Sequence, residues 1–145
     1  MIKEYFDLQE IVCPEVFTKY GQLAWLFFDS RLLATMLALR QRLDKAIYVN
    51  NWTEGGTDTQ KGFRCIQCEI VEKAIADKVL YVSEHITGQA WDFQVDGMQT
   101  EEVRQYIIKN KTLWPYPIRM EAGVSWIHLG TRNDGSVSKV ILFNK

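Results

Sequence analysis

Residues 83–92 read SEHITGQAWD, and the organisation of the chain is easiest to understand from this segment. It holds His85 and Asp92, two side chains of types that bind metal ions, on either side of a glycine. If His85 ends one strand and Asp92 lies on the next, Gly88 permits the tight reversal that brings the two side chains together. The small side chain of Ala90 leaves room between them for a shared ion. The segment therefore predicts two metal ligands that meet at a turn.

A second histidine supplies a third ligand. The chain contains only two histidines, and His128 lies in the segment WIHLG, residues 126–130, which we expect to form a neighbouring strand. A lone histidine is more often structural, but two imidazoles and one carboxylate suit zinc, and three protein ligands leave the fourth position open for water. That open position distinguishes a catalytic zinc site from a structural one. We therefore predict a zinc site formed by His85, Asp92 and His128.

The C-terminal half shows a pattern typical of strands, with short β-branched and aromatic runs between turn residues. Thr100 is a good N-cap, and Glu101 and Glu102 favour the helix dipole, so we expect a helix from there to about residue 110. The sequence Asn-Asp-Gly at residues 133–135 predicts a hairpin. The expected strands are 80–83, 90–95, 119–122, 125–129 and 137–143, with the last two joined by that hairpin.

The N-terminal half is predicted to be mainly helical. Asp29 or Ser30 can cap a helix to about residue 46, whose apolar positions recur at steps of three and four. The other expected elements are a helical opening at 7–20, a strand at 47–49, a polar loop at 50–58 and a helix at 65–78. We therefore expect an α+β fold with N-terminal helices packed on a small antiparallel sheet. The length of 145 residues predicts one domain, residues 1–145.

The composition excludes several classes of partner. A formal net charge of −1 and the lack of a basic run argue against binding to DNA or RNA. The longest strongly apolar stretch, residues 32–39, is too short to span a membrane, and the charged start has no apolar core of a signal peptide. We therefore expect a monomeric protein without a membrane span that is made in the cytoplasm.

Three cysteines, Cys13, Cys65 and Cys68, make an odd number that argues against a disulfide framework. The pair Cys65-x-x-Cys68 would need two further ligands to form a structural zinc site, and Cys13 offers only one more thiolate. A redox dithiol would need a strand-to-helix setting that the sequence does not indicate. We therefore interpret all three as ordinary buried or half-buried thiols.

The spacing of the predicted ligands resembles a pattern found in a known family of enzymes. The pattern Ser-x-His-x-x-Gly-x-Ala-x-Asp followed by Trp-x-His is similar to that of the zinc D-Ala-D-Ala carboxypeptidase and phage endolysin family of murein peptidases. Residues 6–13 resemble the opening segment of that family, and residues 49–52 resemble the segment before its substrate-binding arginine. The matching positions of the central pattern are Ser83, His85, Gly88, Ala90, Asp92, Trp126 and His128.

The resemblance implies a fold, a cofactor and a substrate. The fold would be the hedgehog/DD-peptidase type of α+β fold, the cofactor Zn²⁺, and the substrate the stem peptide of peptidoglycan. The protein would hydrolyse an amide bond, as a carboxypeptidase or an endopeptidase, once it is released or exported to the cell wall by another route. The alternatives are a peptide- or murein-binding module without activity on the same fold, and a structural domain with incidental histidines.

The resemblance also implies residues that contact the substrate. Arg64 matches the arginine of the family, whose guanidinium would hold a substrate carboxylate or carbonyl through paired hydrogen bonds. The alternative for Arg64 is an ordinary surface residue on a loop. Ser83 and Trp126 are further candidates for contact with the substrate.

The general base is the position where this chain departs from the family. Many members have a glutamate three residues before the last histidine, where this chain has Ser125, and an aspartate two residues after it, where this chain has Gly130. A hydroxyl has no useful basicity at neutral pH. Glu121, seven residues before His128, is therefore the candidate for the catalytic base, because a short hairpin would return it to the metal.

Overall fold

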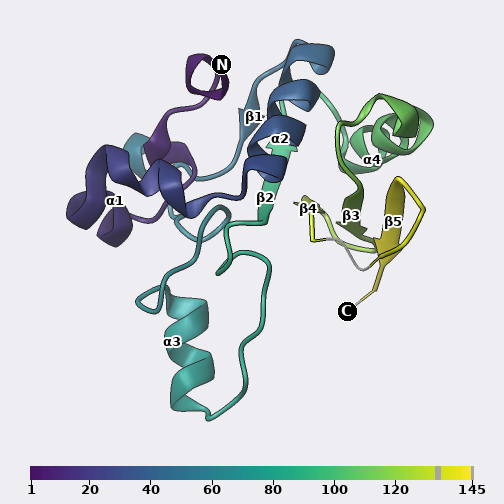
Figure 1. Cartoon of the computed structure of the whole chain (residues 1–145). Helices are drawn as coiled ribbons and strands as arrows, with labels where there is room; N and C mark the ends of the chain where they lie inside the picture. Colours follow the sequence, from purple (N-terminus) through teal and green to yellow (C-terminus); the bar gives the residue numbers. More distant parts are fainter. Residues whose placement is uncertain (133–134, 145) are drawn as a thin grey trace.

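The computed structural model describes residues 1–132 and 135–144, which form an α+β fold (Figure 1). The α-helices are α1 (Pro14–Tyr20), α2 (Ser30–Leu43), α3 (Glu69–Ala76) and α4 (Thr100–Lys109). The strands are β1 (Ile47–Tyr48), β2 (Ala90–Val95), β3 (Ile118–Glu121), β4 (Ile127–Gly130) and β5 (Val140–Phe143). Short 3-10 helices span Ile2–Glu4, Leu8–Glu10, Gly21–Phe27, Trp52–Glu54 and Lys111–Leu113. The predicted α+β class is confirmed.

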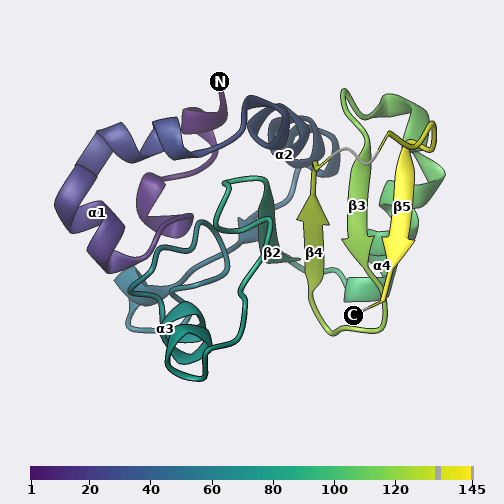
Figure 2. The same ribbon diagram turned by 60° about the horizontal axis from the view of Figure 1, so that its bottom comes forward.

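The strands form one sheet in the order β1-β2-β4-β3-β5. Neighbours are antiparallel except for β3 and β5, which are parallel, so the prediction of an antiparallel sheet is wrong at that edge. The predicted hairpin between the last two strands is wrong as well, because β3 lies between β4 and β5 (Figure 2). Residues 133 and 134 of the predicted turn lie outside the described residues.

The longest helix, α2, forms where the sequence predicts it. The carboxylate of Asp29 accepts a hydrogen bond from the Arg31 backbone N–H at 2.8 Å and so caps the first turn. Leu32, Met36 and Leu39 are buried along one face, as the periodicity requires. The helix ends three residues earlier than expected, at Leu43, because Asp44 has a left-handed conformation with φ of 50°.

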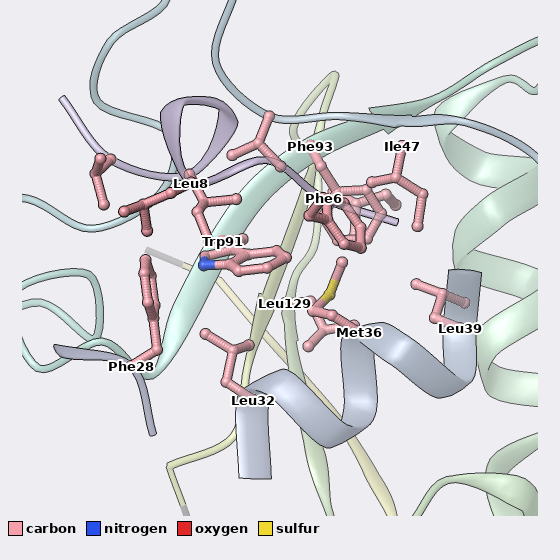
Figure 3. Close-up of a cluster of buried hydrophobic side chains, with 14 of the residues drawn as sticks. Phe6, Leu8, Phe28, Leu32, Met36, Leu39, Ile47, Trp91, Phe93 and Leu129 are labelled. Carbon is pink, nitrogen blue, oxygen red and sulfur yellow. The ribbon is translucent and has the colours of Figure 1, made fainter. Parts of the chain in front are cut away.

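The sheet has one apolar and one polar face because side chains alternate along each strand. Trp91 and Phe93 of β2 and Leu129 of β4 point toward α2 and the N-terminal segment, where they form the centre of the core (Figure 3). Phe28 packs edge-on against Trp91 with ring centroids 5.7 Å apart. The intervening residues, among them Asp92 and His128, therefore lie on the opposite face.

Other predicted elements are shorter than expected. The helical opening is split into Leu8–Glu10 and α1, because Pro14 starts a new helix at its first position. The helix predicted at 65–78 is reduced to α3, which buries only Val71. Residues 80–83 form no strand, although the chain is described there.

None of the described helices is long and apolar enough by itself to cross a membrane. The bent pair Pro14–Phe27 and Ser30–Leu43, with an angle of 88° between its arms, reaches that length and apolarity only when both arms are counted together. Four residues of the second arm are buried in the protein, namely Leu32, Thr35, Met36 and Leu39.

Candidate metal centre

The three predicted ligands, His85, Asp92 and His128, meet on the polar face of the sheet; we call them the metal centre. Asp92 of β2 and His128 of β4 are directly opposite each other in the antiparallel register. His85 lies in a turn before β2 and not at the end of a strand, as the sequence analysis had assumed. Gly88 makes this turn possible, because its φ is +66° and a Cβ there would lie 2.0 Å from the Phe27 carbonyl oxygen.

The donor atoms of the metal centre have the spacing that one ion requires. His85 Nε2 lies 3.3 Å from His128 Nδ1 and 3.2 Å from Asp92 Oδ2. Tetrahedral zinc with bonds of about 2.0–2.1 Å separates its ligand atoms by about 3.4 Å. The third distance, 2.7 Å between His128 Nδ1 and Asp92 Oδ1, is that of a hydrogen bond. The three side chains could therefore hold one metal ion after only a small displacement of one pair.

Contacts behind the two imidazoles orient their free nitrogens toward the shared point. His85 Nδ1 lies 2.7 Å from the Gly62 carbonyl oxygen, which can only accept, so Nδ1 carries the proton and Nε2 keeps its lone pair. His128 Nε2 lies 3.3 Å from Glu84 Oε2 and donates to it, which leaves Nδ1 for the metal. Such outer partners are typical of metal-binding histidines, because they fix the tautomer and the ring orientation.

The carboxylates next to His128 favour a positive charge on this side chain. Burial raises the pKa of Asp92, but the contacts with His128 and His85, led by the hydrogen bond from His128, outweigh burial and hold that pKa well below its usual range. Burial lowers the pKa of His85. Burial also opposes protonation of His128, yet the Asp92 and Glu84 carboxylates raise its pKa to about 9. Without a metal the site therefore holds a proton on His128, which a zinc ion would displace.

Arg64 is part of this cluster, and the alternative that it is an ordinary surface residue is wrong. The side chain is buried, and Nη2 lies 3.0 Å from Asp92 Oδ2. Its other hydrogen bonds go from Nη1 to the Tyr81 hydroxyl at 2.7 Å and from Nε to the Gln60 carbonyl at 2.6 Å. Arg64 therefore holds one oxygen of a predicted metal ligand.

Glu84 is a residue of the candidate site that the sequence analysis missed. Its carboxylate is buried beside His128, and Arg119 and Arg132 approach its Oε1 at 3.7 and 3.9 Å. A Cβ at position 130 would lie 1.9 Å from Glu84 Oε2, so Gly130 leaves the space that this carboxylate occupies. The glycine at position 130 is the sequence signal that could have indicated a close approach of another group there.

The candidate base, Glu121, lies on the strand beside β4. Arg119 pairs with Gly130 and Met120 with Leu129, and the same register continued by one residue places Glu121 opposite His128. Arg119, two residues earlier and therefore on the same face, contacts Glu84 and the Phe143 ring. Glu121 is buried, at 5% exposure. Its position is therefore on the polar face, one strand away from the metal centre.

Two pockets flank the metal centre. A cavity of about 410 Å³ is lined by Asp92, Arg64 and Trp126, together with residues of the loop 57–61. A second cavity of about 300 Å³ is lined by His128, Ser83 and Glu84, among others. The three candidate substrate-contacting residues, Arg64, Ser83 and Trp126, therefore line space next to a predicted metal ligand. Ser83 also has a local contact, because its hydroxyl accepts a hydrogen bond from the His85 N–H at 3.3 Å.

Comparison of the chain with protein-family models, with curated proteins and with solved structures finds no match. The geometry of the metal centre, its outer contacts and the two flanking pockets are therefore the basis for assigning a function.

Proposed function

We propose that the protein is a zinc-dependent peptidase that hydrolyses an amide bond in peptidoglycan stem peptides. The proposal includes the hedgehog/DD-peptidase type of fold and a relationship to the zinc D-Ala-D-Ala carboxypeptidase and endolysin family. The convergence of His85, Asp92 and His128 on one point, with both imidazole tautomers fixed from behind, is the observation that carries it. Zinc held there supplies a Lewis acid that polarises a carbonyl and activates water.

Glu121 is proposed as the general base. A carboxylate on the polar face can take a proton from the attacking water and return it to the leaving amine. Glu84 is less suited to this task, because it faces the outer nitrogen of His128 and two arginines. Two observations support this assignment. The register of β3 on β4, continued by one residue, places Glu121 opposite His128, and Glu121 is buried.

Arg64, which holds Asp92, is also proposed to bind the substrate. An arginine has five N–H donors, and three of them are used in the hydrogen bonds to Asp92, Tyr81 and Gln60 described above. Within the described part of the chain, two donors are then left for a carboxylate or carbonyl in the cavity that Arg64 lines. Trp126, 37% exposed at the same cavity, offers an apolar surface for the peptide.

The proposal is tested by digestion of purified peptidoglycan with zinc-loaded protein, followed by mass spectrometry of the fragments. We expect new amine and carboxylate ends in stem peptides, with the mass of the fragments identifying the bond. His85→Ala should abolish the release. Asp96→Asn is the matched control, because Asp96 lies in a turn after β2, away from the ligands.

A binding module without activity is the second candidate, and one observation favours it. Ser125 occupies the position where the related peptidases have their base, and it is exposed at the rim of the cavity that contains Trp126. If zinc-loaded protein binds peptidoglycan in a pull-down but releases no fragments, the binding module is correct and the peptidase is not. If it neither binds nor cuts, both proposals fail.

A further inference from the structure

We propose a second metal site, a structural zinc site formed by the thiolates of Cys13, Cys65 and Cys68, which we call the thiol cluster. The sequence analysis interpreted these residues as separate buried thiols, but the structure brings their three sulfur atoms together. Cys13 Sγ lies 3.6 Å from Cys65 Sγ, and Cys65 Sγ lies 3.9 Å from Cys68 Sγ. The proposal is independent of the peptidase activity, because none of these residues belongs to the metal centre.

The sulfur spacing is that of zinc ligands. Zn–S bonds of about 2.3 Å at tetrahedral angles separate the sulfur atoms by about 3.8 Å, which lies between the two measured distances. A disulfide would need a separation of about 2.05 Å, and all three cysteines are free. Thiolate sulfur selects soft or borderline metals such as zinc over magnesium or calcium. Zinc binding would release the three thiol protons to solvent.

The backbone around the cysteines is already arranged for an ion. The Phe63 N–H donates to the Ile11 carbonyl at 2.9 Å, so the two segments run side by side and carry Cys13 and Cys65 to the same place. The Cys65 N–H lies 3.4 Å from Cys68 Sγ, a contact that stabilises a thiolate. A water molecule can supply the fourth ligand, and so can Glu15, which lies two residues after Cys13 in the sequence.

The position of the thiol cluster suggests what the zinc would do. It lies at the root of residues 65–83, which we call the α3 lobe and which project away from β3 and β5 (Figures 1 and 2). Helix α3 buries only Val71, while Ile66, Ile75 and Leu80 are 74%, 60% and 86% exposed. Apolar packing therefore holds this lobe weakly. An ion shared with Cys13 would fix the lobe to the N-terminal segment and hold the backbone next to Arg64.

Cobalt titration of the reduced wild-type protein tests the proposal. Cobalt(II) bound to thiolates has a sulfur-to-metal charge-transfer band in the near ultraviolet, which a histidine and carboxylate site lacks. We expect two equivalents of cobalt per chain, of which one produces the band. Because the chain has only three cysteines, all in the thiol cluster, the band can have no other source.

Variants separate this site from the metal centre. Cys65→Ser should remove the band, lower the bound cobalt by one equivalent, and speed hydrogen exchange in residues 65–83. His85→Ala should remove the other equivalent of bound cobalt and keep the band. Ile66→Ser, next to Cys65 but exposed, is the matched control and should bind two equivalents. A reduced wild-type protein without the band overturns the proposal even if Cys65→Ser does not fold, and so does a band that survives in Cys65→Ser.

Discussion

The metal centre and the α3 lobe are built in opposite ways, although Arg64 connects them. In the metal centre, neighbouring strands β2 and β4 hold two ligands in register, and buried contacts fix each imidazole from behind. In the α3 lobe, a single residue of the helix is buried and much of the apolar surface is exposed. The sheet therefore holds the candidate ligands in place before any ion binds, whereas the lobe depends on contacts at its base. Mutations should therefore have large effects in the metal centre and small, local effects in the α3 lobe.

The largest effect is expected from Asp92→Ala. This change leaves the buried guanidinium of Arg64 without its carboxylate partner, and an uncompensated buried charge costs about 3–5 kcal/mol. Urea denaturation in the presence of a chelator should show a loss of that size in the free energy of unfolding, and zinc should no longer bind at the metal centre. Asp96→Asn should change neither quantity. A loss below about 1 kcal/mol would show that the centre is not the rigid part of the molecule.

The next effect is a pH dependence of the protein without metal. The pKa of His128 is raised to about 9, so its protonation stabilises the folded state fully below about pH 6.5. This contribution is lost as the pH rises through 9, and the free energy of unfolding should fall by about 3 kcal/mol at most across that interval. The pKa of His85 is shifted downward, so that residue titrates below this interval.

Denaturation in the presence of a chelator, between about pH 6 and 9.5, measures the slope of the free energy of unfolding against pH. Glu84→Gln is the matched variant, because it removes one of the two carboxylates that raise the pKa of His128 and should reduce the slope. Zinc should reverse the trend, since its binding requires that His128 lose the proton. A flat profile in chelator would contradict the charge distribution described for the metal centre.

Glu121→Gln should have an effect on the rate of hydrolysis and little effect on structure. Removing a general base lowers kcat by on the order of 100-fold or more, while zinc content and the free energy of unfolding should stay near the wild-type values. Initial rates of fragment release from peptidoglycan, together with elemental analysis for zinc, measure both quantities. Full activity of this variant would move the base to another residue, with Glu84 as the next to test.

The smallest effect is expected in the α3 lobe. Val71→Ala removes two buried methyl groups and should lower the free energy of unfolding of the lobe by about 1–2 kcal/mol. Ile75→Ala, at a position 60% exposed, should change it by less than about 0.5 kcal/mol. Hydrogen exchange resolved by peptide reads the lobe separately, and zinc affinity at the metal centre should be equal in both variants. A large fall in that affinity for Val71→Ala would show that the two regions are not independent.

The parts of the structure that depend on local signals could be predicted from the sequence. The apolar spacing and the Asp29 cap identify α2 to within three residues of its end. The glycine between His85 and Asp92 indicates their convergence, because few other residues adopt the positive φ of Gly88. These features need only short-range geometry and two adjacent strands.

The features that the sequence did not reveal depend on contacts between distant segments. The parallel pairing of β5 with β3 overrides a local hairpin signal, since edge pairing is decided by packing. The approach of Cys13 to Cys65 spans 52 positions and follows from a backbone hydrogen bond at Ile11. Glu84 is similar, because its role is visible only once β4 brings Gly130 beside it.

The close approach of Glu84 to Gly130 makes the two positions interdependent. A Cβ at position 130 would lie 1.9 Å from Glu84 Oε2, so a larger residue there has to displace the carboxylate that accepts a hydrogen bond from His128. Gly130→Asp alone would put two negative charges in the same space, whereas the same change combined with Glu84→Gly would leave a single carboxylate there. The residues that position 130 can accept are therefore decided by a side chain that is distant in the sequence.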